Sequence, residues 1–171
     1  NTIVAGIGLG YADAGPTHYS TEDFACFRAI VGSSIYTPSD VLLTRLIAKQ
    51  MLRKPEFSYV RLDRGVLSDI SPKRSEADFI SGYKIFGEVN DEKIALISHG
   101  KMFHNCLDIY NKNKEKFFCV DLFRSKPFPE DLPKKILACK GIVAVDEQSP
   151  SGNLASCIFE GFSNQNYYPK I

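Results

Sequence analysis

Short apolar runs alternate with amphipathic segments along the 171 residues of the chain, and this alternation constrains the fold more than any other feature. The apolar runs are continuous, which is typical of strands in parallel sheets that are covered on both faces. The segments between them repeat apolar residues every three or four positions, as amphipathic helices do. The pattern therefore predicts an α/β fold made of two α/β/α units with mostly parallel sheets.

The individual elements follow from the same pattern. Strands are predicted at residues 2–5, 34–37, 57–62, 83–86, 93–98, 116–122 and 141–146. Helices are predicted to begin at Ser20 and at Ser39 or Asp40, to carry the apolar residues from Phe103 to Tyr110 and from Leu132 to Leu137, and to run from about 152 to 162. In the first helix the buried stripe is expected to be Phe24, Phe27 and Ile30.

A polar stretch separates two halves of this pattern. Ser, Pro, Lys, Arg, Glu and Asp dominate residues 66–82 without a sustained period, which is typical of a linker. We therefore expect one unit in residues 1–74 and a second in residues 75–171. Strand patterns begin at once at the first residues and again at 167–171, so we expect the chain to be part of a longer polypeptide.

Charge and cysteine content exclude several classes of function. The net charge is +1 and both signs are spread evenly, so neither a nucleic acid nor a membrane surface is expected as a partner. No apolar run approaches the roughly 18 residues of a membrane span. The five cysteines lie within apolar runs and form no C-x-x-C pair, which predicts buried free thiols in a reducing, cytoplasmic compartment.

The stretch from Gly15 to Asp23 is the strongest candidate for chemistry. It follows a strand and a glycine-rich loop, and sites in open α/β sheets lie in loops at the carboxyl ends of strands. Ser20 can cap the following helix, with Asp23 as its capping-box partner. His18 lies near that positively polarised helix end, which favours the neutral imidazole that suits a base or a hydrogen-bond donor. An ordinary turn histidine is the alternative that spacing leaves open.

Other polar residues also follow predicted strands. Arg64 could clamp a phosphate or carboxylate through two hydrogen bonds, or it could be a solvated arginine. Asp146 and Glu147 could form a site or a structural cap. His99 and His104 lack the paired spacing of a zinc site, and no metal ligand is expected in the chain.

The glycine-rich loop does not complete a dinucleotide-binding fingerprint. Gly6 and Gly8 would require the next glycine at position 11, where Tyr11 stands. No helix pattern opens directly after the loop either. We therefore expect Gly6, Gly8 and Gly10 to serve a flexible or tightly turned backbone.

Residues 8–23 resemble the signature of transketolase-like thiamine-diphosphate enzymes, whose pyrimidine-binding domain carries the pattern G-P-T-H-x-x-x-E-D that residues 15–23 match. The similarity extends in order over nearly the whole chain. It includes Phe27-Arg28, Pro38-Ser39-Asp40 and residues 59–65 in the first unit, and residues 83–85, 94–100, 120–122, 143–147 and 152–154 in the second. The resemblance implies the second half of a pyrimidine-binding domain, followed by most of a C-terminal domain.

The resemblance also implies an activity. Such enzymes transfer a two-carbon ketol unit between sugars or sugar phosphates with thiamine diphosphate and Mg²⁺. The cofactor would be bound mostly by regions outside this chain, and the catalytic glutamate would precede it, so the chain alone is expected to be inactive. A diphosphate-binding domain or subunit is the implied partner, in a homodimer or a heterotetramer.

The resemblance also implies a role for individual residues that match the family's pattern. His18 would contact substrate hydroxyls and move a proton. Arg64 would bind the substrate phosphate, while Asp13 and Thr17 would contribute to substrate binding. Glu22 would be a supporting acid beside the turn.

The chain departs from the transketolase pattern at several positions. Ala14 stands where transketolases have an acid, Gly6 stands where a phosphate-binding histidine is expected, and Gln148 replaces a histidine. Three alternatives therefore stay open. They are a non-catalytic assembly or regulatory module, the β-type subunit of a 2-oxo acid dehydrogenase, and a deoxyxylulose-phosphate synthase.

Overall fold

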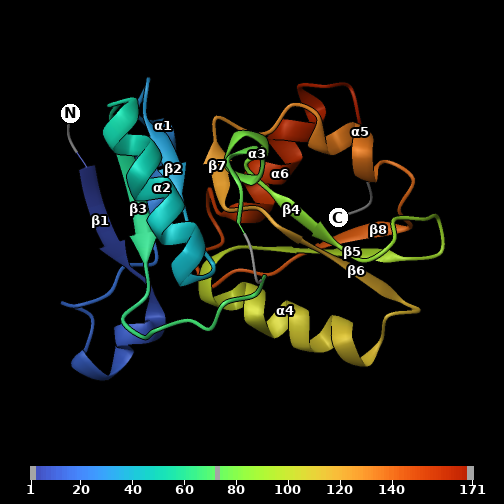
Figure 1. Ribbon diagram of the computed structural model, residues 1–171, viewed down its shortest axis with the longest axis horizontal. Coiled ribbons are helices and arrows are strands. Elements are labelled where there is room, and N and C mark those ends of the chain that lie inside the picture. Colours follow the sequence, from blue (N-terminus) through green and yellow to red (C-terminus); the bar gives the residue numbers. More distant parts are fainter. Residues whose placement is uncertain (1–2, 72–73, 169–171) are drawn as a thin grey trace.

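Two four-stranded sheets organise the chain (Figure 1). The computed structural model describes residues 3–71 and 74–168. The strands are β1 (Ile3–Ile7), β2 (Ser34–Tyr36), β3 (Ser58–Leu62), β4 (Lys84–Phe86), β5 (Ile94–Ser98), β6 (Phe117–Asp121), β7 (Arg124–Lys126) and β8 (Gly141–Ala144). The helices are η1 (Leu9–Ala14, a 3-10 helix), α1 (Asp23–Ala29), α2 (Val41–Arg53), α3 (Glu76–Ser81), α4 (Gly100–Lys112), α5 (Leu132–Ile136) and α6 (Leu154–Ser163).

The first sheet has the order β1-β3-β2-β7. The strands β1, β3 and β2 are parallel, and β7 adds to β2 in the antiparallel direction. Neighbouring strand residues face opposite layers: Ile35 and Tyr59 pack with Phe24 of α1, while Tyr36 and Val60 pack with α2. The buried stripe of α2 consists of Leu43, Ile47 and Met51, and Asp40 caps the helix by accepting a hydrogen bond from the Leu43 amide.

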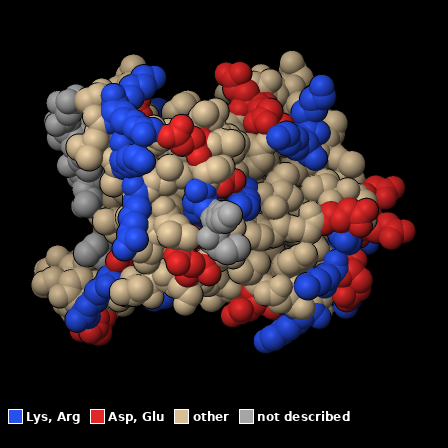
Figure 2. All heavy atoms as spheres, viewed as in Figure 1, with Lys and Arg blue, Asp and Glu red and all other residues tan. Residues whose placement is uncertain are grey.

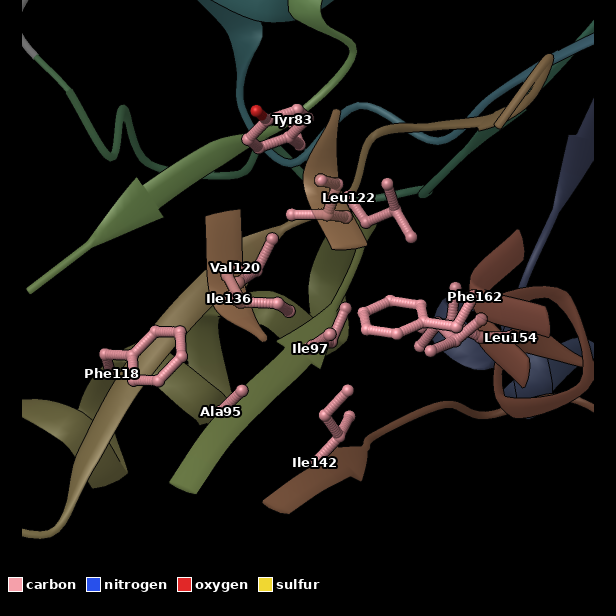
Figure 3. Packing of buried hydrophobic residues seen from close by; sticks show 12 residues of the cluster. Tyr83, Ala95, Ile97, Phe118, Val120, Leu122, Ile136, Ile142, Leu154 and Phe162 are labelled. Carbon is pink, nitrogen blue, oxygen red and sulfur yellow. The ribbon is translucent and has the colours of Figure 1, made fainter. Parts of the chain in front are cut away.

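The second sheet has the order β4-β6-β5-β8. The strand β5 runs parallel to β6 and β8, whereas β4 pairs with β6 in the antiparallel direction. On one face, Phe103 and Cys106 of α4 pack against Leu96 and Cys119. On the other face, side chains from β5, β6 and β8 converge with those of α5 and α6, and Figure 3 shows this larger core around Phe162.

The α/β class and the mostly parallel sheets agree with the prediction. Two strands, β4 and β7, pair in the antiparallel direction, and only β4 matches a predicted strand. The strand β7 has the polar sequence Arg-Ser-Lys and was not predicted. It lies beyond residue 120, yet it completes the sheet built from the first 62 residues. The division of the chain at residues 74 and 75 stays a prediction. Thr2 of the first predicted strand and residues 169–171 of the last pattern lie outside the described residues.

Some predicted helix positions are wrong. The first helix begins at Asp23 rather than Ser20, because the Ser20 and Thr21 carbonyls accept hydrogen bonds from Arg61 and from the Ser149 amide instead of from amides of the helix. The Ser20 hydroxyl still accepts a hydrogen bond from the Asp23 amide, at 3.2 Å. Ile30 and Leu137 were expected on buried faces, but each lies just beyond a helix end and is 42% and 49% exposed, respectively.

The polar stretch of residues 66–82 also contains a helix that its composition did not predict. Helix α3 starts with a capping box between Ser75 and Asp78, and Gly82 ends it in the left-handed conformation. With six residues, it is too short to show an apolar period. Cys26 is a further correction, since it is exposed while the other four free thiols are buried or half-buried. None of the described helices is both long and apolar enough to cross a membrane.

Candidate functional site

The candidate site lies where β1 and β3 end. These strands are parallel neighbours, so their carboxyl ends meet at the same edge of the first sheet. The segment after β1 forms η1 and the turn that carries His18, and Arg64 lies two residues after the end of β3. In Figure 1, η1 (dark blue) lies at the end toward which the arrows of β1 and β3 point.

Tyr11 joins the two halves of this edge. Its ring lies edge-on to the His18 ring, with 5.3 Å between the centroids. The Arg64 guanidinium lies over the same tyrosine ring, with its Cζ 4.1 Å from the Tyr11 centroid, a cation–π distance. Arg64 Nη1 also donates to both carboxylate oxygens of Asp13, at 3.0 and 2.9 Å. We call Tyr11, Asp13, Thr17, His18 and Arg64 the edge cluster.

The turn fixes the His18 ring. Gly15 has φ of 84°, a conformation that favours glycine, and its carbonyl accepts a hydrogen bond from the His18 amide at 3.0 Å. The Thr17 hydroxyl bonds the imidazole Nδ1 at 2.8 Å. Because Nδ1 is engaged by Thr17 and the residue is exposed, Nε2 is the ring nitrogen without a hydrogen bond among the described residues.

Glu22 makes different contacts from the edge cluster. It occupies the cap position of α1 and accepts hydrogen bonds from the Thr21 amide and hydroxyl, at 3.2 and 2.9 Å. These hydrogen bonds lower the pKa of the exposed Glu22 carboxyl. The structure thus gives Glu22 a local role at the helix start, and its supporting role in chemistry stays a prediction.

A buried ionic network lies beneath the edge cluster. Arg61 of β3 donates to Asp23, to Glu147 and to the Ser20 carbonyl, at 2.9, 2.5 and 3.0 Å. The Tyr59 hydroxyl donates to the same Asp23 carboxylate. Burial alone would lower the pKa of Arg61, but the two carboxylates raise it, so the guanidinium stays charged.

The remaining sequence candidates take structural positions. His104 Nε2 contacts the Ser39 carbonyl at 2.7 Å. His99 is 2% exposed, lies edge-on to Phe24 and approaches Asp146 at 3.5 Å. Asp146 accepts from the Leu154 amide at the start of α6, as a cap does. Burial raises the pKa of Asp146, but the nearby His99 imidazole and hydrogen bonds from the Leu154 and Glu147 amides outweigh it, and the pKa is lowered.

Sequence reasoning missed Tyr11 and Arg61. In the sequence, Tyr11 stands out only as the residue that breaks a glycine fingerprint, although its place between a glycine loop and the histidine turn could have marked it. Arg61 interrupts the apolar run of β3, and a charge inside a buried strand signals a buried ion pair. Among residues 3–71 and 74–168, no group of three or more His, Cys, Asp or Glu side chains is arranged to hold a metal ion.

The surface charge around the site is mixed. Figure 2 shows Lys and Arg side chains in a band over the position of α2, with both signs interspersed elsewhere on that face. The exposed basic residues of α2 are spaced four apart, at Arg45, Lys49 and Arg53, and therefore lie in one line along the helix. The Arg53 guanidinium pairs with Glu76 of α3.

Known proteins resemble this chain in sequence. A scan against models of protein families finds no match. A subunit of the apulose-4-phosphate transketolase of Phocaeicola vulgatus is 27% identical over 169 residues, which are 95% of this chain and 54% of that protein. Transketolase-like protein 1 of Bos taurus is 27% identical over 165 residues, which are 92% of this chain and 27% of that protein.

Solved structures resemble it in fold. A split-gene transketolase described as an inactive beta4 tetramer has a TM-score of 0.81 at 23% identity, covering 100% of this chain and 55% of that one. The chain is similar to transketolases in sequence and in fold. The transketolase of Leishmania mexicana has a TM-score of 0.72 at 17% identity and covers 86% of this chain.

The transketolase-like chain corresponds to a C-terminal portion of these proteins, as the sequence resemblance predicted. It spans about half of the apulose-4-phosphate transketolase subunit, at 54%, and about a quarter of the longer transketolase-like protein 1, at 27%. The edge cluster lies within this portion.

Proposed function

We propose that this chain is the C-terminal portion of a transketolase-like transferase that moves a two-carbon ketol unit between sugars or sugar phosphates. The observation that carries the proposal is the edge cluster. The histidine and arginine that the resemblance assigns to the substrate come from different strand ends, and Tyr11 contacts both.

The edge cluster offers suitable chemistry for such a substrate. His18 Nε2 faces solvent and can donate a proton to a substrate hydroxyl or accept one. Arg64 uses Nη1 for Asp13, which leaves Nε and Nη2 for a phosphate group. Asp13 and the Thr17 hydroxyl can bind sugar hydroxyls beside them.

The cofactor is assigned to this enzyme through the family. Thiamine diphosphate, when bound, supplies the nucleophile and the electron sink that cleavage beside a carbonyl requires. Asp13 is the one carboxylate of the edge cluster and is bonded by Arg64, while the other groups are hydroxyl, imidazole and guanidinium groups, which fit a sugar phosphate better than Mg²⁺. We therefore assign the diphosphate and its Mg²⁺ to a domain or subunit outside this chain, and this chain's residues bind and orient the substrate.

A partner follows from the same proposal. Support comes from the names of two similar proteins, since one is a single subunit of a transketolase and the other is a split-gene transketolase. We infer that a diphosphate-binding domain or subunit completes the site, in a homodimer or heterotetramer. The five unpaired thiols favour a reducing compartment such as the cytoplasm.

The test uses the complete enzyme, purified with its diphosphate-binding domain or subunit and supplied with thiamine diphosphate and Mg²⁺. Transfer of a two-carbon unit from a ketose phosphate to an aldose is the expected result. Release of carbon dioxide from a 2-oxo acid in place of transfer would overturn the transketolase reaction and favour a dehydrogenase or synthase. Absence of both reactions in a preparation that binds the cofactor would favour a non-catalytic module.

One structural observation keeps the non-catalytic module as a second candidate. The resemblance places a phosphate-binding histidine near Gly6, but the Tyr59 hydroxyl fills the space that a Cβ of Gly6 would need. No side chain fits there without moving Tyr59. Phosphate recognition in this chain therefore depends on Arg64 more than it does in the standard pattern.

A further inference from the structure

We propose that Glu147, acting through Arg61, is a positioning residue for the His18 turn, so that the second half of the chain sets the geometry of the edge cluster. The catalytic consequence rests on the proposed function. The positioning itself rests on contacts within this chain and can be tested without any activity.

The first contact that carries the inference is the path from Glu147 to the turn. Glu147 follows β8, and its Oε1 accepts a hydrogen bond from Arg61 Nη1 at 2.5 Å. Arg61 Nη2 in turn donates to the Ser20 carbonyl, two residues after His18, at 3.0 Å. The side chains of Arg61 and Glu147 are 4% and 10% exposed, so water competes little with these bonds.

A second contact runs parallel to the first. The Ser149 amide donates to the Thr21 carbonyl at 2.9 Å. The loop that carries Glu147 and Ser149 is itself anchored, because Asp146 accepts from the Leu154 amide of α6. The Thr21 carbonyl is therefore bonded by the loop directly, and the preceding Ser20 carbonyl is bonded by Arg61, which the same loop binds through Glu147.

The other end of the segment is held by close packing. Gly8 is buried directly before η1, and a Cβ at this position would collide with the Glu147 carboxylate and the Arg61 guanidinium. The Arg61–Glu147 pair thus touches the chain at Gly8 and at Ser20. The residues between them include Tyr11, Asp13, Thr17 and His18, so one buried pair fixes both ends of the segment that carries most of the edge cluster.

Glu147 can be neutralised without leaving the buried charge of Arg61 unpaired. Two carboxylates, Asp23 and Glu147, pair with this one guanidinium. In Glu147→Gln the side chain keeps its size and a hydrogen-bond acceptor, and Asp23 still balances the charge of Arg61. The variant should fold, because no buried charge is left unpaired.

The competing explanation is that the pair only joins the two halves of the chain. A matched control exists for this role, because Arg28 of α1 donates to Glu160 of α6 at 2.5 Å. This second ion pair also joins the halves through α1, but within the described part of the chain no hydrogen bond or ring contact links its residues to the edge cluster. Glu160→Gln therefore removes a joining contact without touching the proposed path.

The experiment measures the His18 imidazole and amide by NMR in the full 171-residue chain and in Glu147→Gln and Glu160→Gln. The imidazole signal is assigned with His18→Gln. A neutral amide binds the Arg61 guanidinium more weakly than a carboxylate does. We therefore expect Glu147→Gln to loosen the edge-on contact with Tyr11, to shift the imidazole resonances and to speed exchange of the His18 amide by about 10-fold. Glu160→Gln should change neither.

Gly8→Ala provides a second variant, since it disturbs the same pair by volume and retains both charges. It should move the His18 signals in the same direction. Unchanged His18 signals in both Glu147→Gln and Gly8→Ala, or equal changes in Glu160→Gln, would overturn the positioning role. If the signals change while the complete enzyme shows no transfer in any form, the proposed function fails and the positioning role stands.

Discussion

Arg61 and Glu147 form an ion pair with 2.5 Å between Nη1 and Oε1, buried where the two sheets meet. A second buried arginine repeats the arrangement. Arg74 Nη2 donates to Asp40 at 2.8 Å and to Asp121 at 2.9 Å, and all three side chains are 1% exposed or less. Each arginine therefore joins an acid from the first 62 residues to an acid from beyond residue 120, which fixes the two sheets relative to each other.

Replacing Arg74 by Met should destabilise the fold strongly. The change leaves Asp40 and Asp121 buried without their counterion, and breaking a buried pair costs about 3–5 kcal/mol. The midpoint of urea unfolding measures this loss. Arg53→Met is the control, because Arg53 and Glu76 form an exposed pair that should contribute little. Similar midpoints for the two variants would contradict the role of Arg74.

Thiol reactivity should identify Cys26. Burial raises the pKa of Cys106 to about 11 and of Cys119 and Cys157 to about 12, so these thiols hold little thiolate near neutral pH. Cys26 is exposed. Titration of the native chain with a disulfide reagent at about pH 8 should show one fast thiol, and Cys26→Ser should remove the fast phase. A fast phase that survives this substitution would show that the half-buried Cys139 or one of the buried thiols reaches the reagent.

Stability should fall at alkaline pH through Tyr36. Burial, followed by the charge of Glu56 and a 3.0 Å hydrogen bond to it, raises the pKa of Tyr36 to about 12. An unfolded tyrosine ionises near pH 10, so between about pH 10 and 12 the unfolded chain loses a proton that the folded chain keeps. The stabilising contribution is complete below about pH 10 and is lost as the pH rises toward about 12. Unfolding midpoints should therefore drop less steeply over that interval in Tyr36→Phe, whereas equal slopes would argue against the shifted pKa.

Substrate phosphate should be recognised by Arg64. In the complete enzyme, Arg64→Ala should raise KM for a sugar phosphate by about 10-fold or more and leave the KM of the unphosphorylated sugar nearly unchanged. Steady-state kinetics with both substrates measure the difference. Arg45→Ala, which removes an exposed arginine on α2, serves as the control. An equal rise in KM for both substrates in Arg64→Ala would mean that Arg64 does not bind the phosphate group.

Much of the fold was predictable from apolar spacing. The spacing of Leu43, Ile47 and Met51 marked α2, and the continuous run of β5 marked a covered strand. Polar or short elements gave no such signal. The strand β7 consists of Arg124, Ser125 and Lys126, and it is a strand only because β2 offers a free edge. Helix α3 depends on its capping box rather than on an apolar stripe.

The candidate site was predictable in part for a related reason. Parallel strands bring their carboxyl ends together, so His18 and Arg64 could be expected at one edge of the sheet. The contacts of Tyr11 with both residues depend on the 3-10 turn of η1, which has no periodic signature. The sequence also misled on Gly8, which was expected to serve a flexible or tightly turned backbone. In the structure, Arg61 and Glu147 occupy the space that a Cβ of Gly8 would need.

His18 is proposed to act on the substrate of a transketolase-like reaction. The most direct measurement is two-carbon transfer by the complete enzyme carrying His18→Ala, compared with the unchanged enzyme at equal cofactor occupancy. Because the side chain is exposed and its ring nitrogen bonds the neighbouring Thr17, the fold should be retained, which far-ultraviolet circular dichroism checks. Turnover by His18→Ala should fall by about 10²–10⁴-fold, the range for a group that transfers a proton. Turnover equal to that of the unchanged enzyme would contradict this role.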